Sequence, residues 1–144
     1  MITRSNVLFA ACRTAMLAEL QADIQTNLIP QFNSEIEDIR RQGAETEEFA
    51  ADQPELAKAA LLNLVRARRS ARLLELTNKR RQFLDGIKLR LKLEMSEKAS
   101  ELSGTITTHT DDRNRTVEVV QFPDGSSTKM PNNVYVDFSQ FDRL

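Results

Sequence analysis

The sequence predicts a mainly α-helical protein with a small β-rich C-terminal appendage, that is, an α+β chain in which an elongated helical hairpin or bundle precedes a β-hairpin and an extended arm. Three observations support this class. The 144 residues include only four Gly and four Pro, which favours long uninterrupted elements. Aromatic residues make up 6% and Trp is absent, so a core must rely on Leu, Ala and Ile, which suits helix packing. After Gly104 the composition changes from Ala and Leu to Thr and Val, which separates a helical body (1–103) from an appendage (104–144).

The first predicted helix covers about residues 5–28. Ser5 or Asn6 can cap its N-terminus, and apolar residues then recur at a spacing that favours an amphipathic helix. We expect Pro30 to stop this helix or to offset it, because proline has no amide proton to donate inside a helix.

A second, shorter helix is predicted at about residues 32–42. Phe32, Ile36 and Ile39 would share one face of it. Gly43 follows directly and is expected to end the helix, since glycine is common just after a helix C-terminus.

The third predicted helix covers about residues 53–103 and begins at the clearest local signal in the chain. Asp52 is the expected N-cap, Pro54 lies in the first turn, and Glu55 follows three residues after the cap, which is a variant of the capping box. From Pro54 to Gly86 no further Pro or Gly interrupts the sequence. A long helix is therefore expected.

The segment Ile87–Met95 allows two predictions. Apolar and charged residues alternate in it, as in a strand, and Asp85-Gly86 before it would suit a hairpin turn. Most of its residues are nevertheless good helix formers, and Ile87 is the one β-branched residue among them. We favour the helix; the strand alternative would start the β structure near Gly86.

The appendage is predicted to contain short strands joined by turns. Thr105–Thr110 and Thr116–Phe122 are Thr- and Val-rich and are separated by the polar turn Asp111–Arg115. Pro123–Ser127 is a second turn, and Val134–Phe138 is expected to form a third strand.

On a helical wheel, the third helix has two apolar stripes on opposite sides. The first stripe consists of Leu56, Ala57, Ala60, Leu61, Leu64, Ala67, Ala71 and Leu74. The second stripe consists of Leu73, Leu76, Leu84, Ile87, Leu91, Met95 and Leu102. Either the helix is kinked near Thr77–Arg81, or it packs one neighbour with its first half and another with its second half. The second option implies a partner subunit, because one small chain can hardly cover both faces.

The segment 65–93 contains ten Lys or Arg residues and two acidic residues, so nucleic acid binding is one hypothesis. The cations available for contact are Arg66, Arg68, Arg69, Arg72, Lys79, Arg80 and Arg81. These charges form no single continuous face, the whole chain has a net charge of −1, and Phe83 is the one aromatic residue among them. Acidic residues between Glu35 and Glu55 can neutralise the segment, within the chain or across a subunit interface. We therefore do not favour nucleic acid as the partner.

The sequence has no constellation typical of catalysis. Its one His, His109, and its one Cys, Cys12, cannot build a zinc site. No Gly-rich phosphate loop or GxSxG motif occurs, and the adjacent Asp111 and Asp112 suit a turn better than an acid–base pair. We expect no enzymatic activity, no catalytic, cofactor-binding or metal-binding residues, and no cofactor.

The chain is predicted to be made in the cytoplasm. It has no apolar run long enough to span a membrane, so no membrane partner is expected. Arg13 and Glu19 interrupt the apolar start, which argues against a signal peptide. The single Cys12 cannot form an internal disulfide and lies among alanines, where a buried, unreactive thiol is expected.

The C-terminal segment is unusually apolar because it contains Tyr135, Phe138, Phe141 and Leu144. Two predictions stay open for it. It either covers the core of its own chain as a last strand, or it is a docking arm that inserts its aromatic rings into a neighbouring subunit.

Together these observations predict a non-enzymatic structural or assembly subunit that forms a homo-oligomer and contacts neighbouring subunits of a larger assembly. A virion component of the phage connector or tail-adaptor type is its most concrete form, by analogy of architecture. The expected interface residues are Leu73, Leu76, Leu84, Ile87, Leu91, Met95, Tyr135, Phe138, Phe141 and Leu144. The alternatives are a nucleic-acid-associated accessory protein that uses the basic helix 65–93, and a small regulator that binds one protein partner.

Overall fold

Helices dominate the structure, a computed structural model that describes residues 2–131 and 133–144. A small three-stranded antiparallel sheet follows them, so the predicted α+β, mainly helical class is confirmed. The residues group into two units that alternate along the chain. Unit 1 comprises Met1–Asp23 and Asp85–Val136, and unit 2 comprises Ile24–Leu84 and Asp137–Leu144.

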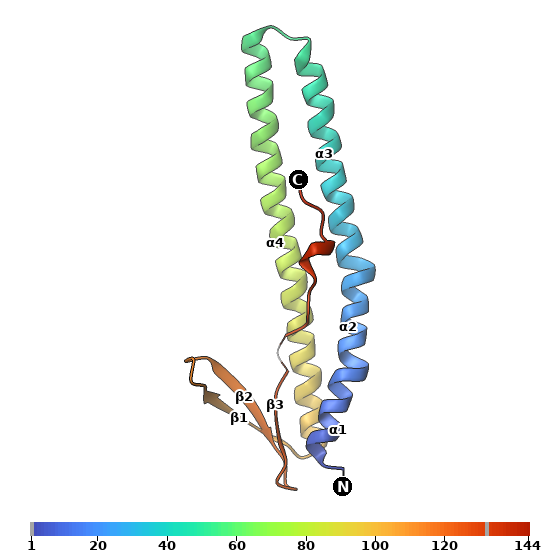
Figure 1. Cartoon of the computed structure of the whole chain (residues 1–144), viewed down its shortest axis with the longest axis vertical. Helices are drawn as coiled ribbons and strands as arrows, with labels where there is room; N and C mark the ends of the chain where they lie inside the picture. The colour runs from blue at the N-terminus through green and yellow to red at the C-terminus, as the bar shows by residue number, and fades with distance from the viewer. Residues whose placement is uncertain (1, 132) are drawn as a thin grey trace. The chain divides into compact units, whose positions relative to one another are not determined.

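The first helical run consists of consecutive segments. They are α1 (Arg4–Ala11), η1 (Cys12–Met16), α2 (Leu17–Asp23), η2 (Ile24–Leu28) and α3 (Ile29–Ala51) (Figure 1). The N-cap is Thr3 rather than Ser5 or Asn6, because the Thr3 hydroxyl oxygen accepts a hydrogen bond from the Asn6 amide at 3.1 Å. Both η1 and η2 are π-helical turns, which hold one residue more than an α-helical turn.

Pro30 does not interrupt this run, contrary to the expected stop or offset. It lies in the first turn of α3, directly after the π-helical turn η2. A proline ring crowds the carbonyl four residues earlier and offers no amide proton. The wider turn of η2 relieves that crowding, which is the physical reason that helical structure continues through Pro30.

Two further boundaries differ from the sequence expectations. Gly43 lies inside α3, which ends only at Ala51, and Asp52 is the C-cap of α3 instead of the N-cap of the next helix. That helix, α4, begins at Glu55 and ends at Glu101. Gly43 is tolerated inside α3 because the guanidinium of Arg69, on α4, occupies the space that a Cβ atom would take.

The segment Ile87–Met95 lies within α4 and is helical, as favoured from the sequence. Ile87, Leu91 and Met95 recur every four residues and are all buried, so one face of the helix packs on the core. The apparent alternation therefore reflects a helix with apolar residues on two sides rather than a strand.

The end of α4 is a Schellman motif that leads directly into the sheet. The Gly104 amide donates to the Ala99 carbonyl at 2.7 Å, the Ser103 amide donates to the Ser100 carbonyl at 3.0 Å, and Ser103 has a φ of 61°. These bonds satisfy carbonyls that the last helical turn leaves open and reverse the direction of the chain.

The sheet has the order β1-β2-β3 with antiparallel neighbours. Strand β1 (Thr105–Thr110) pairs with β2 (Thr116–Gln121), and β2 pairs with β3 (Ser127–Lys129). The first two strands are close to their predicted ranges. The third lies within and just after the predicted turn, whereas Val134–Phe138 forms no strand and is followed by the short 3₁₀ turn η3 (Phe138–Gln140).

Unit 1 has a core in which α1, α2, the last part of α4 and the sheet meet. Its fully buried side chains are Leu8, Leu20, Leu91, Met95 and Val120. Each buried side chain of this size contributes about 1.5–3 kcal/mol through removal from water. Two ion pairs lie around the core: Arg90 pairs with Asp23 at 3.1 Å, and Lys92 pairs with Glu118 at 3.0 Å.

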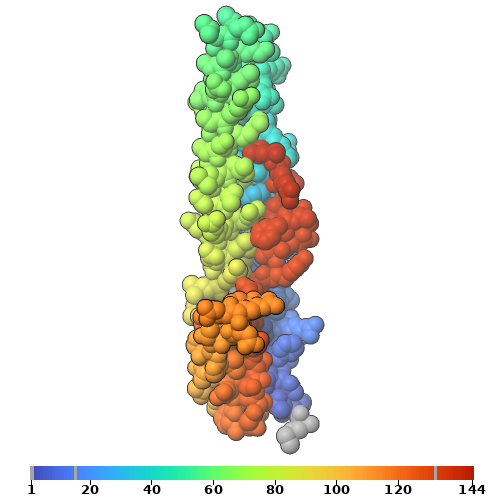
Figure 2. Space-filling view, turned by 60° about the vertical axis from the view of Figure 1, so that its left-hand side comes forward, coloured from blue at the N-terminus to red at the C-terminus, as the bar shows by residue number. Residues whose placement is uncertain are grey.

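Unit 2 is an antiparallel pair of α3 and the first part of α4, with the C-terminal residues packed against both helices (Figure 2). Its buried side chains are Ile24, Leu28, Ile29, Phe32, Ile36, Ile39, Ala50, Val65, Leu76, Leu84 and Phe141. The core of unit 2 therefore depends on the C-terminal segment as well as on the two helices.

Candidate functional site

The second apolar stripe of α4 is buried by the chain itself. Leu76, Leu84, Ile87, Leu91 and Met95 are all at most 9% exposed, and Leu73 is half-buried. In unit 2 this side of α4 packs against α3, and in unit 1 it packs into the core described above. These residues, expected at a subunit interface, are instead inside their own units.

The first apolar stripe of α4 is exposed. Leu56 and Leu74 are 89% and 64% exposed, and Leu64 is 42% exposed. We define the α4 stripe as the exposed residues Ala57, Ala60, Leu64, Ala67, Ala71 and Leu74. They alternate at spacings of three and four residues, which is the heptad pattern of helices that pair along a seam. The exposed apolar face of α4 is therefore the first stripe, whereas the second stripe was expected to form the subunit interface.

The C-terminal segment packs on its own chain. Phe141 is 4% exposed, and its ring meets the Phe32 ring edge-on at a centroid separation of 5.0 Å. Asn33 fixes the backbone of the segment twice, because its amide group donates to the Gln140 carbonyl at 3.0 Å and accepts from the Asp142 amide at 2.8 Å. This packing corresponds to the first of the two open predictions, without the strand.

Arg80 is the centre of this contact. Its guanidinium lies over three rings, those of Phe32, Phe138 and Phe141, at 5.0, 5.2 and 5.0 Å from the centroids. Burial lowers the pKa of Arg80. We call this group the Arg80 cage. Tyr135, Phe138 and Leu144 are 77%, 54% and 42% exposed, so Phe141 is the one buried residue of the four that were expected at the arm's interface.

The basic residues of the segment 65–93 have different surroundings. Arg66, Arg68 and Arg81 are exposed, and among the described residues none of them has an ion pair or hydrogen bond. Lys79 pairs with Glu75 at 3.4 Å on the surface of α4. Arg69 and Arg72 pair with acidic residues of α3, which agrees with the expected neutralisation within the chain.

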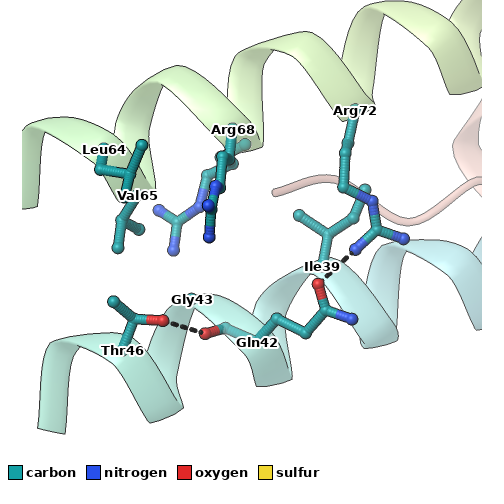
Figure 3. A pocket seen from close by; sticks show the side chains of 9 residues that line it. Ile39, Gln42, Gly43, Thr46, Leu64, Val65, Arg68 and Arg72 are labelled. Atoms are coloured by element: carbon teal, nitrogen blue, oxygen red, sulfur yellow. Dashed lines mark hydrogen bonds between the residues drawn. The ribbon is translucent and has the colours of Figure 1, made fainter. Parts of the chain in front are cut away.

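Three of these arginines line one cavity between α3 and α4 (Figure 3). Arg68, Arg69 and Arg72 extend from α4, and we call this site the arginine pocket. It has a volume of about 60 Å³ and its other lining residues are Ile39, Gln42, Gly43, Thr46, Leu64 and Val65. Among the described residues, none of those that line it is acidic.

The three arginines differ in how many hydrogen bonds and ion pairs their guanidinium groups form. Arg72 donates to the Gln42 Oε1 atom at 2.7 Å and to Asp38 at 3.2 Å. Arg69 has a looser ion pair with Glu47 at 3.7 Å, and its Nε atom is buried without a hydrogen-bond partner in the part of the chain described. Arg68 has neither kind of partner there. The pocket thus keeps hydrogen-bond donors and positive charge that the protein does not use.

Gly43 explains how Arg69 fits against α3. A Cβ atom at this position would lie 2.6 Å from the Nη2 atom of Arg69, so glycine leaves room for the guanidinium on the helix backbone. The sequence pattern predicts neither this role of Gly43 nor the pocket. A glycine inside an otherwise uninterrupted apolar repeat was the available signal, but its partner lies in another helix.

Unit 1 contains a larger cavity of about 330 Å³. It is lined mainly by apolar side chains and by two cations: Leu8, Phe9, Cys12, Arg13, Leu17, Met95, Thr128, Lys129 and Pro131. Cys12 is buried, as expected, and burial raises the pKa of its thiol, so the unreactive protonated form is favoured. This cavity offers no activated nucleophile.

Other candidates for chemistry are on the surface. His109 is exposed on β1 and shares a hydrogen bond of 3.0 Å with the Thr107 hydroxyl. The Asp111 carboxylate accepts the amides of Arg113 and Arg115, so it shapes the β1–β2 turn. Within residues 2–131 and 133–144 no group of three or more His, Cys, Asp or Glu side chains could hold a metal ion. Over the same residues, no helix combines the length and apolar character needed to cross a membrane.

Comparison with known proteins adds no family: no family model, curated protein or solved structure matches the chain.

Proposed function

We propose that this protein is a non-enzymatic assembly subunit that associates with a second copy of itself through the α4 stripe. The observation that carries the proposal is an exposed apolar heptad repeat on the side of α4 that α3 leaves uncovered. Large exposed apolar surfaces of this kind mark sites of protein association.

The stripe is suited to a close helix pair because small residues alternate with leucines. Four of its six residues are alanine, which lets two helix backbones approach, and no charged residue interrupts it. Covering Leu64 and Leu74 on both copies would contribute up to about 1.5–3 kcal/mol for each leucine.

A second copy is the occupant that fits best, because the stripe complements itself in an antiparallel, two-fold arrangement. One register matches each leucine with an alanine of the partner and closes the seam symmetrically. In that register Leu64 faces Ala67, Leu74 faces Ala57, and Ala60 faces Ala71. Asn63 and Ser70 would then meet at one rim, where they can exchange a hydrogen bond.

The experiment that tests the proposal is a native mass measurement by light scattering or sedimentation. We expect a multiple of 16.4 kDa that falls to 16.4 kDa on dilution. Ala71→Glu places a charge within the stripe and should give a monomer with unchanged helix content. Ala59→Glu is the matched control, because Ala59 is an exposed alanine of the same helix outside the stripe.

Two results would contradict the proposal. One is a wild-type chain that stays monomeric at the highest concentration measured. The other is an oligomer that both glutamate variants weaken equally, since that would indicate a general effect of charge on α4.

The more specific expectations stay part of this proposal. Incorporation into a virion, as a phage connector or tail-adaptor component, is supported by analogy of build alone. Synthesis in the reducing cytoplasm is supported by the single buried thiol of Cys12.

A further inference from the structure

We propose that the arginine pocket binds one phosphate group. This inference does not rest on self-association, because it uses three arginines that are not part of the α4 stripe; Leu64 is the one residue that the pocket and the stripe share. The ligand class is defined by its chemistry, a tetrahedral oxyanion of the phosphate type, which is either free or part of a larger molecule.

The arginine pocket contains positive charge that the chain does not fully neutralise. Three guanidinium groups line one small cavity, no carboxylate is among its lining residues, and only Arg72 is fully engaged by the chain. Like charges gathered in a confined space repel one another unless an anion lies between them. An anion in the pocket would convert this repulsion into attraction.

The pocket also contains hydrogen-bond donors that lack partners in the described chain. Arg68 has no partner in the described chain, and the closest carboxylate oxygen to Arg69 is 3.7 Å away, longer than a good charge-assisted hydrogen bond. The planar fork of a guanidinium matches the oxygen spacing of phosphate, so each arginine can donate two parallel bonds. The two adjacent forks together offer the donors that one phosphate group needs.

The size of the pocket also suits a small anion. A volume of roughly 10–15 Å³ is enough for one water molecule, so about 60 Å³ leaves room for a group of several atoms such as one phosphate. The unit 1 cavity, at about 330 Å³ and with a mostly apolar lining, offers no comparable match.

Gly43 also positions Arg69. Because residue 43 lacks a Cβ atom, the Arg69 guanidinium lies against the backbone of α3. Thr46, which also lines the pocket, donates its hydroxyl to the Gln42 carbonyl at 3.0 Å (Figure 3). The Arg69 donors are therefore held in place before a ligand arrives. Preorganisation of this kind lowers the entropic cost of binding.

The test is a titration of the isotope-labelled full chain with inorganic phosphate, followed by the NMR signals of backbone amides. We expect the Gly43 signal to shift with saturation, while Gly125, in the other unit, does not shift. Arg68→Gln and Arg69→Gln should each weaken the affinity by about tenfold or more, since a charge-assisted hydrogen bond contributes about 1.5–3 kcal/mol.

Matched controls distinguish phosphate binding in the arginine pocket from a general effect of positive charge on α4. Arg66→Gln removes an exposed arginine of the same helix that does not line the pocket, and it should change the affinity less than twofold. Gly43→Ala keeps all charges but displaces the Arg69 guanidinium, so it should weaken phosphate binding while helix content is retained. It also keeps the proposal testable if the Arg69 variant fails to fold.

A second arm distinguishes the source of the phosphate group. A short duplex DNA replaces inorganic phosphate, and its affinity is measured at two salt concentrations for the same variants. If Arg68→Gln weakens both ligands, the pocket accepts a phosphate of a nucleic acid backbone; if it weakens only inorganic phosphate, the natural ligand is a small phosphorylated molecule.

The proposal is overturned if neither ligand shifts the Gly43 signal, or if Arg66→Gln weakens binding as much as Arg68→Gln. The native mass of each variant is measured alongside. Because the pocket variants leave the α4 stripe intact, loss of phosphate binding with an unchanged mass, or the reverse, shows which of the two proposals fails.

Discussion

The Arg80 cage shows how a single charged side chain can organise an apolar contact. The guanidinium lies over three phenylalanine rings, one from α3 and two from the C-terminal segment. Each ring contributes an electrostatic attraction of about 0.5–2 kcal/mol, depending on how far the site is removed from water. The stem of Arg80 also fills space that the rings would otherwise leave open.

We therefore expect Arg80→Ala to lower the free energy of unfolding by about 1–3 kcal/mol. The matched variant is Arg81→Ala, because Arg81 is exposed and has no partner in the described chain. It should change stability by less than about 0.5 kcal/mol. Urea unfolding of the two variants, compared with the wild type, measures the difference. Equal losses would show that the rings do not depend on the cation.

Two glycines, one inside α4 and one directly after it, have different roles in the helix and its end. Gly86 is exposed inside the helix, and a Cβ atom there would meet nothing within 4 Å. Gly104 follows the Schellman motif, and a Cβ atom there would lie 2.6 Å from a Val120 methyl and 2.8 Å from the Phe122 ring. The same residue type is thus dispensable in one position and required in the other.

The expected outcome is opposite for the two alanine substitutions. Gly86→Ala should stabilise the chain by about 1 kcal/mol, because alanine restricts the unfolded chain and favours the helix. Gly104→Ala should destabilise it by about 1–3 kcal/mol through overpacking against β2 and the residue after it. Thermal unfolding by circular dichroism measures both. A destabilised Gly86→Ala variant would contradict a continuous helix at this point.

Local patterns predicted the elements well wherever the pattern and the propensity agreed. The β1 and β2 strands and the helical nature of Ile87–Met95 follow from turn residues, β-branched residues and helix formers in the sequence. Val134–Phe138 has a strand composition but no pairing partner; its neighbours are held by side chains such as Asn33 instead. Composition alone does not reveal the absence of a partner.

The candidate sites could be predicted only in part, because they depend on which helix faces α4. The sequence shows two apolar stripes on α4, but both satisfy the same periodicity, so it does not reveal which one α3 covers. The arginine pocket is similar: Arg68 and Arg69 are visible as cations, but the role of Gly43 appears only when α3 lies beside them. Tertiary packing decides both cases.

At the scale of the whole molecule, three carboxyl groups link the fold to pH; Asp124 is exposed, and Asp111 and Asp137 are half-buried. Hydrogen bonds lower the pKa values of Asp111, Asp124 and Asp137. The shift is largest for Asp124, whose pKa falls from 3.8 to about 2, chiefly because the Arg4 amide donates to it and then because Ser126 does. Folding therefore favours the ionised form of these groups, and their contribution is lost in acid.

The sign of the effect follows from the lowered pKa. The stabilisation from Asp124 is fully present above its ordinary pKa near 4 and disappears as the pH falls toward 2. We expect Asp124→Asn to lower stability at pH 7 and to flatten the loss between pH 4 and pH 2. Urea unfolding over this pH range is the measurement. Asp112→Asn is the control, since Asp112 has no hydrogen bond or ion pair among the described residues, and it should leave the slope almost unchanged.

The π-helical turn η1 determines which face of α1 is buried. The Leu17 amide donates to the Cys12 carbonyl five residues earlier, so one residue is accommodated as an insertion within the helix. Removing that residue would restore an α-helix but rotate α1 by about 100°. Leu8, which is fully buried, would then turn away from the core. Deletion of one residue at η1 is therefore compatible with this core only if α1 exchanges its buried face at the same time.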